Sequence, residues 1–498
     1  QLPRRLEENV RLRLRALKKY EKVLREDYEA WYRDNRDYRE RVRADESRLA
    51  YHLMPETGWL NDPNGLCQFQ GLYHIYYQYT PFEPTGEIKL WGHYTTRDFI
   101  HYKQEEPALF PDQDLDAHGV YSGSAYVEDK TIHYFYTGNV KLFDRDDYDY
   151  IMSGRVSNTI HVTSRDGYHF SAKELVMNHK DYPADMSCHI RDPKVFKKGE
   201  YYYMVLGARD ALSKGMVLVY RSMDLTNWEY FNRITTEQTF GYMWECPDLF
   251  CLDGQLCLVC CPQGVKPMGT EYQNVHQCTV FCLDYDFREN TIRLNSQFPV
   301  MVDRGFDFYA PQTFLDEQGR RILIGWMGIP DAEYTNPTVK AGWQHALTMP
   351  RLLHMREGRL LQQPLEEMKE LRRDRRDYDF WELGKGVETG LVFEACLSME
   401  SCSDMCLTIR DDVTLSYQDG LLTLDMGTSG SGRTRRSVLL EQLTDLRIFS
   451  DTTSLEIFVN NGLEVFTTRV YGDRPGMRIK GKCCGTVSVY ELSGFIYE

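Results

Sequence analysis

The chain has 498 residues, of which 42% are hydrophobic, and this length predicts two or three domains with sizeable cores. Its 74 acidic side chains outnumber the 59 basic ones, and the resulting net charge of −15 argues against nucleic-acid binding, which needs a basic surface. No run of eighteen apolar residues occurs, so the sequence predicts no membrane-spanning helix and no membrane partner.

Residues 1–50 are predicted to form a helical N-terminal extension. Arg, Lys and Glu are dense from residue 4 to about residue 45, and Leu12, Leu17 and Leu24 lie among them without strand-like alternation. Because acidic residues interleave with the basic ones, we interpret the charged positions as solvated helix faces and not as a nucleic-acid arm. We expect one long or two shorter helices that pack against the following domain or against a second subunit of a homo-oligomer.

Five segments between residues 51 and 355 share one pattern, in which a polar or acidic motif leads through an aromatic residue and a turn into a β-prone strand. The turns recur every 55 to 69 residues. The thirty-four tyrosines and eight tryptophans also favour β structure, where aromatic side chains pack on pleated surfaces. Units of four short strands, repeated five times, predict a five-bladed β-propeller over residues 51–355. The five motifs are Asn61-Asp62-Pro63, Tyr121-Ser122-Gly123-Ser124, Arg191-Asp192-Pro193, Glu245-Cys246-Pro247 and Ala310-Pro311-Gln312.

The repeat places three carboxylates, those of Asp62, Asp192 and Glu245, at corresponding positions of three blades. Equivalent positions of a propeller lie at the same radius and height around its axis, so we expect these side chains to converge on one site. Each motif alone is also typical of a reverse turn, because Pro, Gly and Asx residues favour turns. Their repetition makes a catalytic or binding site the better interpretation.

The last third of the chain has a different pattern. Residues 356–377 are predicted to be a charged linker, helical over residues 365–377. From residue 378 to 498, strands alternate apolar and polar residues, with hairpin turns at Asp419-Gly420 and Asn461-Gly462, which predicts an antiparallel β-sandwich of structural or weakly sugar-contacting role. The predicted fold class is therefore all-β, a five-bladed β-propeller followed by a C-terminal β-sandwich, with a short N-terminal helical extension.

The fourteen cysteines include the adjacent pairs Cys260-Cys261 and Cys483-Cys484, a poor arrangement for disulfides that favours a reducing compartment. Cys402 and Cys406 have the spacing of metal ligands but lack a matching second pair, so we interpret them as ordinary thiols. The first residues carry charge without an apolar signal region. We therefore expect a cytoplasmic location.

Three motifs resemble, in order, those of glycoside hydrolase family 32, the family of invertases, fructanases and sucrose-6-phosphate hydrolases. They are Trp59-Leu-Asn-Asp-Pro-Asn-Gly65, Arg191-Asp-Pro193 and Glu245-Cys-Pro-Asp248. The resemblance extends from His52 through the sandwich, and it implies hydrolysis of a β-fructofuranosyl bond with retention. By position it implies Asp62 as the nucleophile, Glu245 as the general acid/base and Asp192 as the stabiliser of the transition state.

The resemblance also implies further residues that contact the substrate. Asn61, Gln78, Ser122 and Arg191 match positions that contact the fructosyl unit. Further site residues expected are Trp91, as a lining residue, and Tyr309 and Trp326, at the mouth of the fifth blade, where ordinary blade packing is the alternative.

The mechanism needs one ionised and one protonated carboxyl group around an oxocarbenium-like transition state. We expect hydrogen bonds in a tight turn to keep Asp62 ionised, and burial beside Trp244 and Cys246 to keep Glu245 protonated. Asp192 is expected to remain an anion, with Arg191 as its counter-charge.

The sequence departs from the family pattern in two places. Leu60 replaces a frequent Met, an apolar exchange that we expect to be harmless. The segment 85–90 lacks a Trp that many invertases carry, so the leaving-group side is differently built. Lys89 in that segment either meets an anion such as a sugar 6-phosphate or is a solvated surface lysine.

The leading functional hypothesis is a hydrolase of sucrose or sucrose 6-phosphate, whose partner is a small sugar substrate. An exo-acting fructanase is the alternative among enzymes, and a non-catalytic fructan-binding lectin is the alternative from another class. A Ca²⁺ or Zn²⁺ site of three carboxylates is the structural alternative, but the thirteen histidines show no ligand-like pair near the motifs. We therefore expect no metal and no cofactor.

Overall fold

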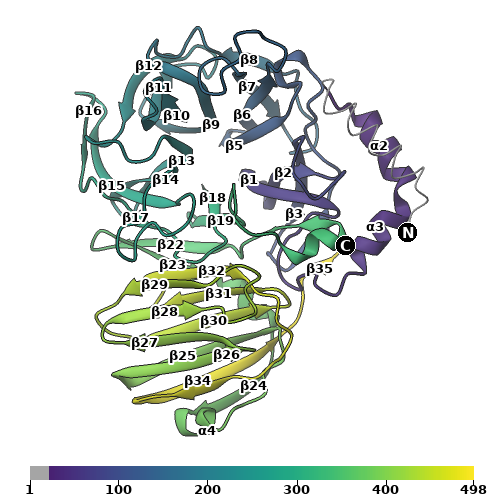
Figure 1. The fold of residues 1–498 in the computed structure, drawn as a ribbon. Coiled ribbons are helices and arrows are strands. Elements are labelled where there is room, and N and C mark those ends of the chain that lie inside the picture. Colours follow the sequence, from purple (N-terminus) through teal and green to yellow (C-terminus); the bar gives the residue numbers. More distant parts are fainter. Residues whose placement is uncertain (1–21) are drawn as a thin grey trace.

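The computed structural model describes residues 22–498, and the predicted helical region before residue 22 lies outside the described residues. Two helices, α2 (Arg25–Asp34) and α3 (Arg36–Arg43), run along the outside of the first blade (Figure 1). The apolar side chains of Val23 and Tyr28 pack there against Phe82, Leu90 and Phe110. None of the helices in the described part of the chain has the length and hydropathy needed to cross a lipid bilayer.

The predicted five-bladed β-propeller is confirmed, and each blade is an antiparallel sheet with its first strand nearest the axis (Figure 1). Neighbouring inner strands contact one another around a closed ring. Buried apolar and aromatic side chains fill the spaces between blades, as β-prone residues on pleated surfaces should. Blades 1 to 3 consist of β1 (Gly58–Phe69), β2 (Leu72–Thr80), β3 (Leu90–Thr96) and β4 (His101–Gln104); β5 (Val120–Glu128), β6 (Thr131–Lys141), β7 (Arg155–Ser164) and β8 (Glu174–Met177); and β9 (Met186–Lys198), β10 (Tyr201–Asp210), β11 (Gly215–Ser222) and β12 (Glu229–Ile234).

Blades 4 and 5 complete the ring and close it onto blade 1. Blade 4 consists of β13 (Met243–Leu252), β14 (Gln255–Gln263), β15 (Thr279–Asp286) and β16 (Thr291–Leu294), with β17 (Val300–Met301) paired to β15. Blade 5 consists of β18 (Tyr309–Leu315), β19 (Arg321–Met327), β22 (Arg351–Arg356) and β23 (Arg359–Pro364), with β21 (Ala346–Leu347) paired to β19. Closure comes from β20 (Trp343–Gln344), which pairs in parallel with β1.

The β-sandwich is also confirmed, and it lies below the propeller in Figure 1. Its apolar faces enclose one continuous core. One sheet has the order β24 (Arg372–Asp379), β34 (Cys483–Leu492), β25 (Phe393–Cys402), β30 (Asp445–Asp451), β31 (Ser454–Val459) and β32 (Glu464–Arg469). The other has the order β29 (Arg435–Leu439), β28 (Leu421–Asp425), β27 (Val413–Gln418), β26 (Asp404–Arg410) and β33 (Arg478–Lys480).

The linker predicted over residues 356–377 is wrong in its bounds, because β23 within it belongs to blade 5, and the helix predicted over residues 365–377 is also wrong. Residues Glu366–Leu371 form a short 3-10 helix, and the next residues form strand β24, which pairs with β34. The charged residues that suggested a helix lie on the exposed side of an outer strand. At the far end of the chain, β35 (Ile496–Tyr497) pairs in parallel with β4, so the C-terminal residues return to blade 1.

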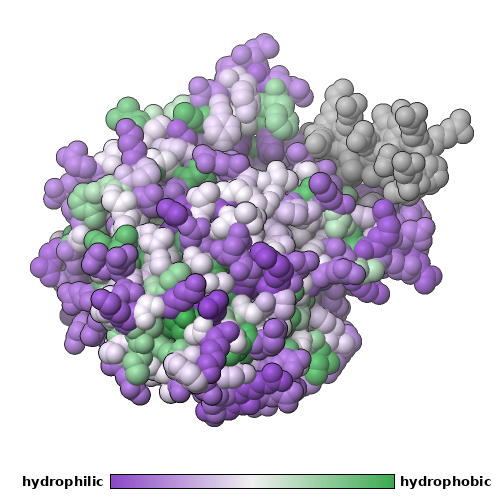
Figure 2. Space-filling view, turned by 60° about the horizontal axis from the view of Figure 1, so that its bottom comes forward, coloured by the Kyte–Doolittle hydropathy of each residue, from purple (hydrophilic) through white to green (hydrophobic). Residues whose placement is uncertain are grey.

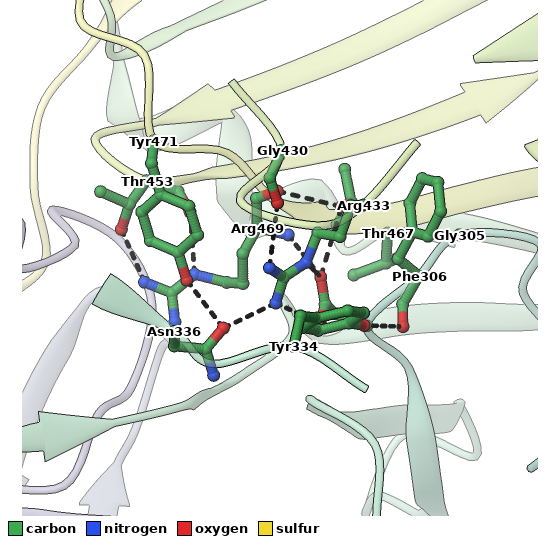
Figure 3. Close-up of polar contacts among 12 residues, drawn as sticks. Gly305, Phe306, Tyr334, Asn336, Gly430, Arg433, Thr453, Thr467, Arg469 and Tyr471 are labelled. Carbon is green, nitrogen blue, oxygen red and sulfur yellow. Dashed lines mark hydrogen bonds and ion pairs between the residues drawn. The ribbon is translucent and has the colours of Figure 1, made fainter. Parts of the chain in front are cut away.

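Buried charged groups join the two domains. Arg433 of the sandwich meets Tyr334 and Asn336 of the propeller in a polar cluster (Figure 3). Arg469 lies in the same view and donates to Thr453 of the sandwich. Arg433 donates to Asn336 at 2.6 Å, and its guanidinium group lies 3.9 Å from the centre of the Tyr334 ring. On the surface shown in Figure 2, by contrast, hydrophobic residues lie scattered in small groups among hydrophilic ones.

Candidate active site

Each inner strand carries a β-bulge at the same place near the axis. A bulge opposes two residues to one on the neighbouring strand, bends the strand and turns side chains to new directions. The five bulges lie between Leu60 and Pro63, Val120 and Gly123, Arg191 and Lys194, Glu245 and Asp248, and Tyr309 and Gln312. The predicted motifs are therefore bulges of paired strands, and not free turns.

The first residue of the bulge is strained in three blades. Asp192, Cys246 and Ala310 occupy this position, and each has a positive φ, at 64°, 48° and 48°. Such a conformation costs a non-glycine residue on the order of 1–3 kcal/mol, so the surrounding sheet must hold it in place. The same strained backbone conformation therefore recurs at three of the bulges around the axis, where it costs local stability and fixes the directions of the side chains.

The sequence predicted that the three acids occupy corresponding positions, and this prediction is wrong. Glu245 is the last paired residue before its bulge, Asp192 is the first residue of its bulge, and Asp62 is the second. The prediction compared the motifs by the positions of their prolines. The pairing of residues between neighbouring strands does not follow these prolines. The structure nevertheless brings the acids together, because the Cys246 thiol lies 3.5 Å from both Asp62 Oδ2 and Asp192 Oδ2.

Asp62 is held by hydrogen bonds from neutral groups. Ser122, at the same bulge position in blade 2, donates to Asp62 Oδ2 at 2.5 Å, and Asn61 donates to Oδ1 at 3.1 Å. Burial raises the pKa of Asp62 above its usual value, against the opposing effect of the Ser122 hydrogen bond, and the charge of Glu245 raises it further. These donors are side chains, and not the amides of a tight turn that the sequence suggested, and burial outweighs their effect on the pKa of Asp62.

Asp192 is buried and accepts a hydrogen bond from the backbone N–H of Cys246 at 2.9 Å. Burial and then the negative charge of Glu245 raise the pKa of Asp192 to about 7, although the charge of Arg191 opposes the shift. Asp192 therefore differs from the permanently ionised group that the neighbouring arginine had suggested.

Arg191 contacts Glu245 directly. Its Nε and one terminal nitrogen each lie 2.8 Å from Glu245 Oε2. Oε1 accepts hydrogen bonds from Gln263 and Tyr309, both at 2.7 Å. Arg191 therefore hydrogen-bonds Glu245, while its charge also acts on Asp192, so it is a counter-charge to both carboxyl groups.

The predicted apolar neighbour of Glu245 is also wrong in part. The side chain of Trp244 points away from the site into the blade, where it stacks on Phe281 and donates to the carbonyl of Phe240. Successive residues of a strand face opposite sides, so a neighbour in the sequence does not pack against Glu245. Every hydrogen-bonding neighbour of the Glu245 carboxyl group is a donor.

The remaining predicted residues divide between the site and the core. Gln78 is buried and donates to the carbonyl of Val120 at 2.8 Å, next to the blade 2 bulge. Trp91 has no exposed surface and packs between blades 1 and 2, so it supports the site without lining it. Trp326 is nearly buried, and its ring lies 5.9 Å from that of Trp59 and 6.2 Å from that of Tyr309.

Trp59 and Gln263 belong to the site although the sequence predicted no role for either. Trp59 donates to Asn61 Oδ1 at 2.7 Å, and the ammonium group of Lys89 lies 4.9 Å from the centre of its indole ring. Lys89 is half-buried, and burial lowers its pKa to about 7, so it is not a fully solvated surface lysine. Trp59 is part of the first motif, so its place at the site could have been predicted from the sequence. Gln263 belongs to no motif, and only its place at the end of β14 brings it to Glu245.

A small cavity of about 20 Å³ lies on the axis among the bulges, lined by Pro63, Gly123, Pro193, Pro247 and Pro311 with their neighbours. This volume is enough for one water molecule. Lys194 and Asp248, which also line it, form an ion pair of 3.3 Å. Among the described residues no group of three or more His, Cys, Asp or Glu side chains is arranged to hold a metal ion.

Comparison with known proteins gives the same result for both domains. Residues 52–364 match the glycosyl hydrolases family 32 N-terminal domain, and residues 367–491 match the glycosyl hydrolases family 32 C-terminal domain. The chain is 38% identical over 445 residues to a sucrose-6-phosphate hydrolase of Bacillus subtilis, covering 86% of this chain and 90% of that protein. It is 36% identical over 487 residues to the corresponding Staphylococcus xylosus protein, covering 91% and 94%.

Solved structures with the same fold include a sucrose-6-phosphate hydrolase from Lactobacillus gasseri, with a TM-score of 0.84 and 28% identity, covering 92% of this chain and 96% of that one. A family 32 β-fructofuranosidase of Bombyx mori has a TM-score of 0.81 and 29% identity, covering 94% and 99%. Both similarities extend over the propeller and the sandwich together.

Proposed function

The chain belongs to glycosyl hydrolase family 32 and is a glycoside hydrolase of the β-fructofuranosidase type, and on this premise we propose that it releases the fructosyl unit of sucrose or sucrose 6-phosphate with retention of configuration. Asp62 is the nucleophile, Glu245 the general acid/base, and Asp192 the group that binds fructose hydroxyls and stabilises the transition state. Arg191, Asn61, Gln78 and Ser122 orient these carboxyl groups and the fructosyl unit.

The observation that supports these roles is the different environment of each acid. Asp62 accepts hydrogen bonds from a hydroxyl and an amide, with no cation in contact, which leaves its carboxylate free to attack carbon. Glu245 contacts Arg191, Gln263 and Tyr309, which fix its orientation beside the leaving oxygen. In a retaining enzyme the two reacting carboxyl groups lie roughly 5 to 5.5 Å apart, and we expect that separation here.

The site also holds the proton that the reaction needs. Of the three neighbouring carboxyl groups, Glu245 contacts the Arg191 guanidinium group, and burial together with the charge of Glu245 raises the pKa values of Asp62 and Asp192. Near neutral pH the group therefore retains a proton. Fructose hydroxyls that donate to Asp192 would stabilise its ionised form and release this proton within the site.

The proposed substrates follow from the relatives, which are sucrose-6-phosphate hydrolases of 35 to 38% identity. We also propose a cytoplasmic location, because all fourteen cysteines are unpaired. Association of two subunits stays a prediction.

The test is substitution of Asp62 by Asn, with sucrose, sucrose 6-phosphate and a fructan as substrates. We expect hydrolysis to fall by at least about a thousandfold on every substrate, while the melting temperature stays within a few degrees, because the amide keeps the shape and loses the nucleophile. Retained activity would refute the nucleophile assignment. For the wild type, an NMR time course should show the first fructose with retained anomeric configuration, and a much higher efficiency on the fructan would favour the fructanase alternative.

A further inference from the structure

Four basic side chains around the mouth of the site stack on aromatic rings and have no acidic partner. None of the four forms an ion pair with another residue that the structure describes. The net charge of −15 makes this unusual, because acidic partners are abundant elsewhere in the chain. The pairs are Lys89 on Trp59, Lys141 on Phe143, Arg155 on Tyr150 and Arg209 on Tyr242, at 4.9, 5.8, 5.4 and 4.4 Å from the ring centres.

Three of these residues form an arc next to the general acid/base. Lys141 ends β6 and Arg155 begins β7, where the two residues are direct cross-strand partners. Arg155 and Arg209 both lie close enough to His189 for their charges to act on it. His189 accepts a hydrogen bond from Arg191 at 2.9 Å, and Arg191 contacts Glu245.

His189 supplies no negative charge to this arc. Because its Nδ1 accepts from the Arg191 guanidinium, its Nε2 carries the proton and donates to the carbonyl of Tyr150 at 2.7 Å. Burial, together with the charges of Arg191, Arg155 and Arg209, lowers the pKa of His189 to about 2, so the ring is neutral. Both of its nitrogens are occupied, and it offers no acceptor to Arg155 or Arg209.

Three acids near the arc are bound elsewhere. Asp147 pairs with Arg145 at 2.7 Å, and Asp149 accepts from the backbone N–H groups of Ile151 and Met152. Asp331 pairs with His276 at 2.8 Å.

Placing Lys141 opposite Arg155 costs stability, because like charges directly opposite each other on paired strands repel. Arg209 donates only to the Ser213 hydroxyl, at 2.9 and 3.2 Å, so part of its guanidinium group is unused. A bound anion would relieve both defects, since guanidinium groups bind phosphate through paired hydrogen bonds.

We propose that Lys141, Arg155 and Arg209 form a subsite for a phosphate monoester on the leaving sugar. This inference rests on the proposed function and specifies its substrate as a phosphorylated disaccharide. Glu245 protonates the leaving oxygen, so the leaving sugar lies on the side of Glu245 and Arg191, where this arc lies. The exposed ring of Tyr150 provides an apolar face for that sugar.

Lys89 is not part of this subsite. Among its electrostatic neighbours Asp62 is the strongest, which places it on the nucleophile side, and its ammonium group stacks on Trp59. The anion that the sequence had suggested for Lys89 is therefore assigned to the arc, whose Lys141 lies close enough to Lys89 for its charge to act on it.

The test compares sucrose 6-phosphate with sucrose as substrates of the wild type and of Arg155→Gln and Arg209→Gln. The wild type should prefer the phosphorylated sugar, and each substitution should lower the ratio of the two kcat/KM values about 10- to 100-fold, mainly through KM. Arg221→Gln is the matched control. Arg221 also lies over aromatic rings, at 4.5 Å from Tyr201 and 4.4 Å from Phe231. It lies on β11, the third strand of blade 3, and pairs with Glu229, so the ratio should not change.

Calorimetry with the product sugars separates this proposal from the proposed function. Glucose 6-phosphate should bind the wild type at least about tenfold more tightly than glucose, and both arginine substitutions should remove the difference. If sucrose is hydrolysed but glucose 6-phosphate binds no better than glucose, the phosphate subsite is refuted and the hydrolase stands. If glucose 6-phosphate binds as expected but neither sucrose nor its phosphate is cleaved, the subsite stands and the proposed reaction is wrong.

Discussion

Substitution of Arg433 by Met should destabilise the contact between the two domains. Arg433 is almost fully buried, and its Nε and one terminal nitrogen donate to the carboxylate of Asp307 at 2.5 and 2.8 Å. The same guanidinium group donates to Asn336 (Figure 3). Methionine would leave the Asp307 carboxylate buried without the cation that hydrogen-bonds it, and breaking a buried ion pair in this way costs about 3–5 kcal/mol.

The expected shift in melting temperature depends on how the domains unfold. At about 2 cal/mol/K per residue, the unfolding entropy of all 498 residues is about 1 kcal/mol/K, so the loss lowers the transition by about 3–5 °C if both domains unfold together. If the sandwich unfolds alone, its unfolding entropy is several times smaller, so the same loss lowers its melting temperature by several times more. Differential scanning calorimetry measures the shift and shows whether there are one or two transitions.

Arg435→Met is the matched control. Arg435 lies two residues away and pairs with Asp425 at 2.6 Å, but its side chain is 73% exposed, so its loss should cost less than about 1 kcal/mol. Equal shifts for the two variants would refute the argument.

Low pH should reduce the difference in melting temperature between the wild type and Arg433→Met. Burial alone would raise the pKa of Asp307, but the charge and hydrogen bonds of Arg433 lower it overall. A depressed folded-state pKa contributes stability above the unfolded value of about 4, and this contribution is lost as pH falls through the folded-state value. The two melting temperatures should therefore converge below about pH 4.

Three further outcomes are expected. Tyr309→Phe removes one donor to Glu245 and should lower kcat/KM about tenfold with little change in melting temperature; an unchanged pH–rate profile and rate would contradict this role. Ser122→Ala removes a hydrogen bond that lowers the pKa of Asp62, so the acidic limb of the pH–rate profile should move to higher pH, and a shift to lower pH would contradict the assignment. A chain ending near residue 377 loses the sandwich and β35, and should be insoluble or inactive; a soluble, fully active propeller would be the opposite result.

The fold was predictable because it repeats. Aromatic strands and turns at regular spacing define a propeller blade by local pattern, and five copies reinforce one another. The helical linker was not predictable, because the charged residues of β24 form an outer strand whose pairing with β34 joins segments more than a hundred residues apart.

The site was predictable in its membership and less so in its contacts. Three acids in repeated motifs had to converge, whereas Arg191 could turn to either Asp192 or Glu245, and only the bulge decides between them. Burial of Trp91 likewise depends on how blades 1 and 2 face each other, which no segment of the sequence encodes alone.

The stagger of the acids along the bulge explains how one repeated element supports a reaction that needs different carboxyl groups. Equivalent positions would give three similar environments with similar proton affinities, whereas retention requires a nucleophile and an acid that differ. A carboxyl group that is shifted by one residue along the bulge has different hydrogen-bonding neighbours. Asp62 meets a hydroxyl and an amide, Asp192 meets a backbone N–H at a strained residue, and Glu245 meets a guanidinium group. The chemistry of the site therefore arises where the five repeats depart from symmetry.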